Sequence, residues 1–307
     1  MPFTERELID WLTARAPRGP EVVLGIGHDA AVVRAPGGDL LVLKSDQTIE
    51  SVHFVRGEQP WGLVGRKALA RVLSDVGAVG GRPVAALCSL ALPADVAQAD
   101  VRALFDGLLE IATANGVSLV GGDLSRSLRG VVIDIAGLGF LEGRGALRRD
   151  GARVGDAIVV TGPLGGSRAG HHLTFEPRWR AGVALAESGV VTSCIDLSDG
   201  LARDLHQIAA ASQVGAQIDT AAVPRRPLAD GGVATIEQAL HDGEDFELLF
   251  TVATTELARL KAAPALRSLE VVAIGTVLPA SAGVVILRPD GTRVPLARGG
   301  YEHPLGI

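Results

Sequence analysis

Residues 67–92, KALARVLSDVGAVGGRPVAALCSLAL, contain the pattern of a helix followed by a buried strand. The helix is predicted over 63–79, because four apolar residues recur there at helical spacing: Leu69, Val72, Leu73 and Val76. The run 84–92 is apolar and stops at Pro93, as expected of a buried strand. This helix–strand unit indicates a layered fold in which helices cover a sheet.

Asp75 stands in the middle of the predicted helix among apolar neighbours. An unpaired carboxylate is costly there, so the position predicts a buried partner, either a cation or a hydrogen-bond donor. Further aspartates are predicted in loops at the ends of apolar strands: Asp29, Asp46, Asp123, Asp196 and Asp199. Each has a plain structural alternative, since Asp beside Gly is common in turns and Asp199 can cap a helix that begins at Gly200.

Strands and helices alternate on both sides of this unit. Strands are predicted at 22–33, 39–46, 118–120, 131–140, 157–161, 193–197, 246–252, 270–277 and 283–288, and further helices at 95–114, 200–212 and 254–262. Thr4 and Glu7 match a capping box for a short N-terminal helix with an apolar face of Leu8, Ile9 and Leu12. The class is therefore α/β (α+β). The Gly- and Arg-rich segment 142–155 lacks a period and separates a domain 1–141 from a domain 142–307.

Composition excludes several classes of protein. Of 307 residues, 47% are hydrophobic, which suffices for a large core, and the net charge of −6 offers no basic face for duplex nucleic acid. The two cysteines, Cys88 and Cys194, form no disulfide framework or cysteine zinc site, and both thiols are expected to be buried. No signal peptide or membrane span is visible, so a cytoplasmic protein is expected.

The acidic residues and the glycines point to phosphate chemistry. Several carboxylates that converge on one cleft repel one another unless cations bind between them, and Mg²⁺ prefers such oxygen ligands. Glycine accounts for 39 residues in distinct clusters, which bring backbone N–H groups close to anionic oxygens. No cluster matches the Walker A pattern or the dinucleotide fingerprint. We therefore expect a Mg²⁺-dependent, phosphate-handling enzyme outside the common nucleotide folds.

Seven ordered segments carry a more specific resemblance: GIGHDAAVV (25–33), SDQTIESVHF (45–54), KALARVLSDVGAVGGRP (67–83), LVGGDLSRS (119–127), ALRRDGARVGDAIVVTGPLGGSRAG (146–170), IDLSDGLARDL (195–205) and HDGEDFELLFT (241–251). With a terminal GGYEHP (299–304), the chain resembles the thiamine-monophosphate kinase family of the aminoimidazole-ribonucleotide-synthetase-like ATP-binding superfamily. The resemblance implies a two-domain fold of that superfamily and a homodimer formed through the N-terminal sheet, with ATP between the domains. It also implies transfer of the γ-phosphoryl of ATP to thiamine monophosphate, which gives thiamine diphosphate.

The resemblance also implies roles for individual residues. Positions matching the family's magnesium ligands are Asp29, Ser45, Asp46, Asp75, Asp123, Asp196 and Asp199. Gly122, Asp123, Arg149 and Ser198 match positions around ATP, and His53, Glu244 and Tyr301 match positions that hold the thiamine phosphate. The phosphoryl transfer is expected to depend on Asp46, Asp75, Asp123, Asp196 and Arg149. The acceptor oxygen is already anionic at pH 7, so no general base is needed to make the nucleophile.

Without the motifs, simpler interpretations exist for several of these residues. His53 is then a structural histidine at a strand end, Glu244 an ordinary turn acid, and Arg149 part of a solvated basic face. The pair His171-His172 falls outside the motifs and is assigned to the surface or an interface.

Three positions depart from the family pattern. His28 stands where an Asp is common, Lys44 where a small hydroxyl residue is common, and Val72 where an Asn is common. Lys44 adds a positive charge near Asp46, so one hypothesis is that this protein binds one Mg²⁺ fewer than its relatives, or binds one more weakly. The rival functions are a superfamily enzyme with another acceptor, and a non-catalytic paralogue that binds ATP or thiamine phosphates.

Overall fold

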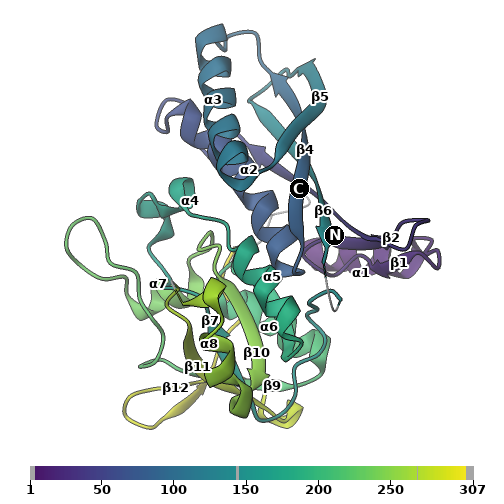
Figure 1. The fold of residues 1–307 in the computed structure, drawn as a ribbon. Helices are drawn as coiled ribbons and strands as arrows, with labels where there is room; N and C mark the ends of the chain where they lie inside the picture. The colour runs from purple at the N-terminus through teal and green to yellow at the C-terminus, as the bar shows by residue number, and fades with distance from the viewer. Residues whose placement is uncertain (1–3, 143–144, 268, 302–307) are drawn as a thin grey trace.

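The computed structural model describes residues 4–142, 145–267 and 269–301 and contains two mixed sheets, each with its own helices (Figure 1). The N-terminal sheet has the order β1-β2-β3-β6-β4-β5, in which only β4 and β5 run parallel. Its strands are β1 (Val22–Leu24), β2 (Ala31–Arg34), β3 (Leu40–Ile49), β4 (Arg82–Leu92), β5 (Ser118–Arg126) and β6 (Val132–Leu141). The helices α2 (Trp61–Ala78) and α3 (Gln98–Asn115) pack on this sheet, and Gly116 ends α3 with φ +67°.

The C-terminal sheet has the order β13-β12-β9-β11-β7-β10-β8. Its strands are β7 (Asp156–Val160), β8 (Val191–Asp196), β9 (Gly215–Asp219), β10 (Leu248–Ala253), β11 (Val272–Leu278), β12 (Val284–Leu287) and β13 (Arg293–Pro295). The helices are α4 (His171–Thr174), α5 (Trp179–Ser188), α6 (Leu201–Ser212), α7 (Ile236–His241) and α8 (Leu257–Lys261). The predicted α/β (α+β) class is confirmed.

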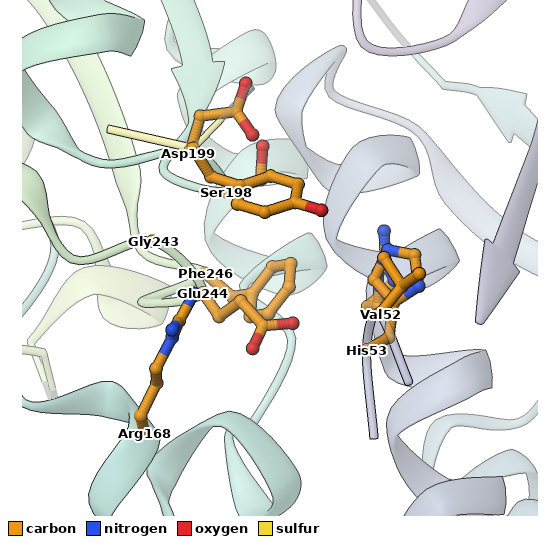
Figure 2. Close-up of a pocket in the computed structure, with 10 residues that line it drawn as sticks. Val52, His53, Arg168, Ser198, Asp199, Gly243, Glu244 and Phe246 are labelled. Carbon is orange, nitrogen blue, oxygen red and sulfur yellow. The ribbon is translucent and has the colours of Figure 1, made fainter. Parts of the chain in front are cut away.

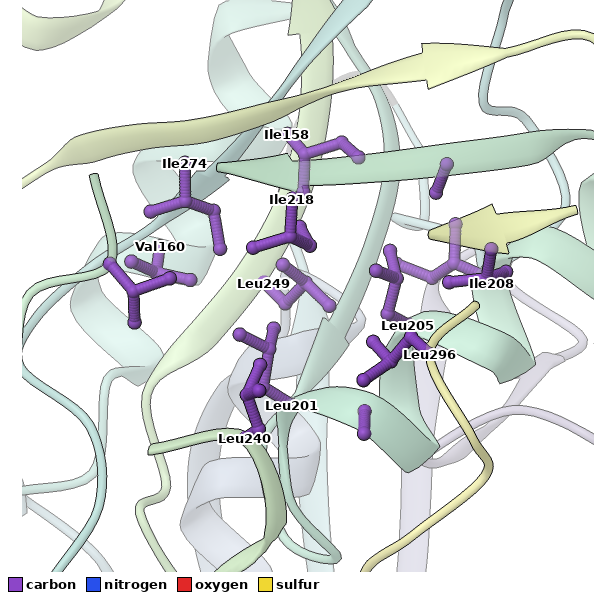
Figure 3. Close-up of a cluster of buried hydrophobic side chains, with 14 of the residues drawn as sticks. Ile158, Val160, Leu201, Leu205, Ile208, Ile218, Leu240, Leu249, Ile274 and Leu296 are labelled. Atoms are coloured by element: carbon purple, nitrogen blue, oxygen red, sulfur yellow. The ribbon is translucent and has the colours of Figure 1, made fainter. Parts of the chain in front are cut away.

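The interior strand β7 explains why this domain has two hydrophobic cores. All five of its residues are buried, and they alternate between the two faces of the sheet. Ile158 and Val160 join a core with α6 (Figure 3), whereas Ala157 and Val159 join another that includes Leu185 of α5. The sheet is therefore covered on both faces. Cys88 and Cys194 are both buried and free, as expected.

Helix α2 belongs to both halves of the molecule. One side packs on α3 and the N-terminal sheet, and its last turn packs on α5 of the C-terminal domain. A Cβ atom at Gly77 would lie 2.5 Å from the Cα of Trp179, and a Cβ at Gly182 would overlap the carbonyl of Gly77. The two helices thus touch backbone to backbone, and α2 presents side chains to groups from both domains.

Three predictions about strands are wrong. The strand predicted at 22–33 is two strands, because the chain turns between β1 and β2 where Gly27 adopts φ +105°. Asp29 lies in that turn, as expected, but Asp46 lies inside β3. Asp123 lies inside β5, which continues past Gly122 to Arg126. Gly122 does not end the strand: it permits a close approach to Cys88, because a Cβ there would overlap the Cys88 carbonyl.

The predicted N-terminal helix is confirmed, whereas the surface alternative for one of the paired histidines is wrong. The capping box of Thr4 and Glu7 begins α1 (Glu5–Arg15), but none of the helix's residues is buried, so its apolar face is uncovered in the single chain. The surface assignment of the histidine pair is wrong for His172, which is 9% exposed, and His171 is half-buried. Within the described residues, every helix is too short or too polar to serve as a transmembrane span.

Candidate active site

Three aspartates from both domains meet in one buried cluster. Asp29 comes from the β1–β2 turn, Asp75 from α2 and Asp196 from the end of β8. One carboxylate oxygen from each lies within 4.8 Å of the others, and all three side chains are buried. Of the described residues, these three form the group that could share a metal ion. Oxygen ligands in this number suit a hard divalent cation.

The carboxylates of the cluster repel one another even though basic side chains lie beside two of them. Burial, with added repulsion from Asp46 and Asp29, raises the pKa of Asp75 to about 7, although Lys44 opposes the shift. Burial and repulsion from Asp75 and Asp29 also raise the pKa of Asp196. Raised pKa values of this kind are typical of buried carboxylates that lie close together with no cation bound between them.

Basic side chains of the chain itself pair with four of the aspartates predicted as metal ligands, one pair being that of Arg203 Nε with Asp199 Oδ2 at 3.4 Å. Lys44 Nζ lies 3.1 Å from Asp75 Oδ2, which supplies the cation that Asp75 was predicted to need. Arg149 Nη2 lies 2.5 Å from Asp29 Oδ1, so Arg149 is not part of a solvated face. A further pair joins Arg71 Nη2 to Asp46 Oδ2 at 3.0 Å. Asp196 accepts a hydrogen bond of 2.7 Å from Ser74 Oγ.

The other predicted metal ligands lie outside the three-aspartate group. Ser45 donates to Asp134 at 3.0 Å. Asp123 is exposed in the edge strand β5 beside Gly122. Asp199 follows β8, and its backbone N–H, not its side chain, is bound by the carboxylate of Asp204. Helix α6 begins at Leu201 with Gly200 as its N-cap and has no side-chain cap, so the capping alternative for Asp199 does not hold.

One pocket brings together the residues predicted to hold the thiamine phosphate (Figure 2). It is lined by Val52, His53, Arg71, Arg168, Ser198, Asp199, Gly243, Glu244, Phe246 and Tyr301. Figure 2 shows His53 on the side of the N-terminal domain and Glu244 on the opposite side, from the C-terminal domain. The mixed polar and aromatic lining suits a small organic ligand.

His53 enters this pocket as a neutral imidazole. Its Nδ1 accepts a hydrogen bond of 3.0 Å from the backbone N–H of Ile49, which places the proton on Nε2. Burial, and then the charges of Arg71 and Lys67, lower the pKa of His53 to about 4. The side chain is therefore a hydrogen-bond donor near pH 7.

Lys67 is the main site residue that the sequence analysis missed. Its side chain is fully buried, and Nζ lies 2.6 Å from Glu244 Oε1 and donates to the His53 carbonyl at 2.9 Å. Lys67 thereby joins the two walls of the pocket. One signal was available: lysine is rare in this chain, and this one precedes an apolar helix face.

The pocket wall formed by Glu244 and Phe246 has an unusual backbone. Both residues adopt positive φ, +65° and +52°, which is rare for side chains of this size. Surrounding contacts hold them: the Glu244 N–H donates to the Ser198 carbonyl at 2.7 Å, and the Phe246 ring stacks on Phe175 at 4.0 Å. This conformation places both side chains in the pocket.

Asp245, between these two residues, points the other way into the C-terminal domain. It accepts from the Gly165 N–H at 3.0 Å and pairs with Arg226 at 3.0 Å, yet burial raises its pKa to about 7. The folded protein thus holds a proton that the unfolded chain loses above about pH 4. Through this carboxyl, the free energy of unfolding should fall by about 1 kcal/mol per pH unit between pH 4 and 7.

Urea unfolding of the wild type and of Asp245→Asn across that range measures this effect. The variant lacks the titrating group, so its stability should decline less steeply with rising pH. Parallel curves for the two proteins would contradict the assignment.

Comparison with known proteins identifies the family to which this architecture belongs. Residues 27–141 match the family of the AIR synthase related protein N-terminal domain, and residues 137–288 match that of its C-terminal domain. The two sheets with an acidic cluster between them are thus those of an AIR synthase related protein.

Individual relatives identify a narrower family among the AIR synthase related proteins. The thiamine-monophosphate kinase of Rhodopirellula baltica is 40% identical over 83% of this chain and 84% of its own length, and that of Bacillus subtilis is 33% identical over 97% and 99%. A solved structure of AaThiL complexed with AMPPCP and TMP superposes with a TM-score of 0.83 at 30% identity, covering 98% of this chain and 97% of the other. This chain belongs to the thiamine-monophosphate kinase family.

Proposed function

We propose that this protein transfers the γ-phosphoryl group of ATP to thiamine monophosphate in a Mg²⁺-dependent reaction that gives thiamine diphosphate. The observation that carries the proposal is the meeting of His53, Glu244 and Tyr301 in one pocket that also contains Ser198 and Asp199, which follow the clustered Asp196. The names of the relatives and the nucleotide complex of AaThiL support the same activity.

The acidic cluster fits Mg²⁺. Three buried carboxylates with oxygens within 4.8 Å, two of them with raised pKa, form a donor set that a divalent cation would stabilise. Asp29, Asp75 and Asp196 would hold it, and we propose Ser45, Asp46, Asp123 and Asp199 as ligands of further ions. Bound Mg²⁺ would offset the repulsion between the two polyanionic substrates.

The residues of the chain bind and orient the substrates. Gly122, Asp123, Arg149 and Ser198 are proposed to hold the ATP phosphates, with Arg149 kept in place by Asp29. The neutral His53 donates a hydrogen bond to the acceptor and takes no proton from it, because the attacking phosphate oxygen is already ionised. Glu244 and Tyr301 are proposed to face the cationic thiamine, which carboxylates and aromatic faces attract.

A homodimer through the N-terminal sheet is part of the proposal. Strand β5 lies at the edge of that sheet, and its Val120 and Leu124 are 63% and 71% exposed. An exposed apolar edge strand is a template for pairing with a second copy. Sedimentation of the purified protein distinguishes the dimer from the monomer.

Turnover with Mg²⁺, ATP and thiamine monophosphate, followed by chromatography of thiamine diphosphate, tests the activity. Product formation supports the kinase. Consumption of ATP without this product indicates another acceptor, and binding of ATP without its consumption indicates a non-catalytic paralogue.

Lys44 leads to a prediction about metal number. Because its ammonium already pairs with Asp75 at 3.1 Å, it takes part of the charge that an additional cation would neutralise. The variant Lys44→Thr should therefore bind one more divalent ion, or bind it more tightly, in the presence of a non-hydrolysable ATP analogue. Counting bound Mn²⁺ by electron paramagnetic resonance measures this. Identical counts and affinities in the variant and the wild type would contradict it.

A further inference from the structure

Helix α2 presents three charged residues in a row that runs from the pocket to the acidic cluster. Lys67, Arg71 and Asp75 are four residues apart, so they lie on one helix face about 6 Å from each other along the axis. Lys67 contacts Glu244 in the pocket wall, and Asp75 belongs to the cluster. Arg71 stands between them, lining the pocket while pairing with Asp46. Arg71 thus lies between the pocket contact of Lys67 and the acidic cluster.

Two contacts orient the guanidinium of Arg71, and one of its N–H donors has no hydrogen-bond partner among the described residues. Nη2 lies 3.0 Å from Asp46 Oδ2, and Nη1 donates to the Gln47 carbonyl at 3.2 Å. Nε is buried and has no hydrogen-bond partner among the described residues. The side chain is only 14% exposed, so its charge is weakly screened. Arginine in such a setting is well suited to bind a phosphate group.

The other cations of the pocket are less suited to this task. Lys67 is occupied by Glu244 and by the His53 carbonyl. Arg168 is exposed and, in Figure 2, lies on the side of Glu244, across the pocket from His53. Arg71 is the pocket cation that also contacts an acidic residue next to the cluster.

We propose that Arg71 binds the phosphate group of the acceptor, and so determines that the pocket accepts a phosphorylated ligand in preference to its free alcohol. This inference rests on the proposed function. Asp46 competes with the ligand for Arg71 when no metal is bound, because both are anions that the same guanidinium attracts.

The experiment compares the binding of thiamine monophosphate with that of thiamine by calorimetry, in EDTA, so that no metal contributes. In Arg71→Gln the affinity for thiamine monophosphate should fall about 10- to 100-fold, the usual effect of losing a charged hydrogen bond, and that for thiamine less than about twofold. Arg71→Lys should retain part of the preference. Arg168→Gln, which removes the same charge from the other side of the pocket, should leave the preference unchanged.

A second variant separates binding from a merely structural role. Asp46→Asn removes the competing anion, so it should strengthen the binding of thiamine monophosphate in EDTA. If Arg71 only held β3 in place, Asp46→Asn and Arg71→Gln would each lower the affinities for thiamine monophosphate and for thiamine by similar factors. That result would overturn the proposal. So would an Arg71→Gln variant that prefers thiamine monophosphate to thiamine as strongly as the wild type does. Failure of the wild type to bind thiamine monophosphate in EDTA would overturn the proposal about Arg71, and failure to bind it with Mg²⁺ and an ATP analogue would overturn the proposed function.

Discussion

Asp75→Asn is expected to lower kcat by about 10²- to 10³-fold, with the protein still folded. Asp75 contributes an oxygen to the three-carboxylate group and is the partner of Lys44 at 3.1 Å. Asparagine preserves the shape and one acceptor oxygen but removes the charge, so the site would hold its cations more weakly while α2 keeps its packing.

The control for this prediction is Asp156→Asn. Asp156 is also buried, but it accepts from Thr192 and from the Arg153 N–H at the start of β7, outside the cluster. Steady-state kinetics with thiamine monophosphate and circular dichroism of both variants complete the test. Turnover by Asp75→Asn within tenfold of the wild type would remove Asp75 from the chemistry.

Lys67→Met is expected to have the largest effect on stability, lowering the free energy of unfolding by about 2 to 3 kcal/mol. The variant leaves Glu244 without its cation and the His53 carbonyl without its donor. We expect the lower end of the range for a buried pair, because the Glu244 side chain remains 21% exposed. The Michaelis constant for thiamine monophosphate should also rise, since both walls of the pocket lose their connection.

The double variant Lys67→Met, Glu244→Gln tests the cause. Replacing the unpaired carboxylate of Glu244 should restore a large part of the stability lost by the single variant, although it should not restore the binding of substrate. Lys261→Met, which changes an exposed lysine of α8, provides the matched control. Urea unfolding measures all four proteins, and a double variant no more stable than Lys67→Met would show that the ion pair is not responsible.

Local patterns in the sequence predicted much of the fold. The apolar spacing located α2 and α6 to within a few residues, and the family motifs identified three residues that the structure brings into one pocket. These predictions succeeded because helix periodicity is encoded within a few neighbouring residues and each motif is continuous.

Other features depend on partners far away in the chain. A buried lysine such as Lys67 is understandable only once Glu244 is known to lie beside it. Helix α5 was not predicted at all, because Gly182 weakens its local pattern, yet that glycine is what permits contact with Gly77. Similarly, Gly122 suggests the end of a strand until the carbonyl of Cys88 is seen against it.

The glycine contact between α2 and α5 has a consequence for how this protein moves. Where two backbones touch without intervening side chains, neither helix can move closer to the other without a steric clash, so we expect α2 and α5 to move together. Opening of the site by separation of α2 from α5 would break this contact. The row of Lys67, Arg71 and Asp75 is therefore expected to keep its position relative to α5 while ligands enter and leave the pocket.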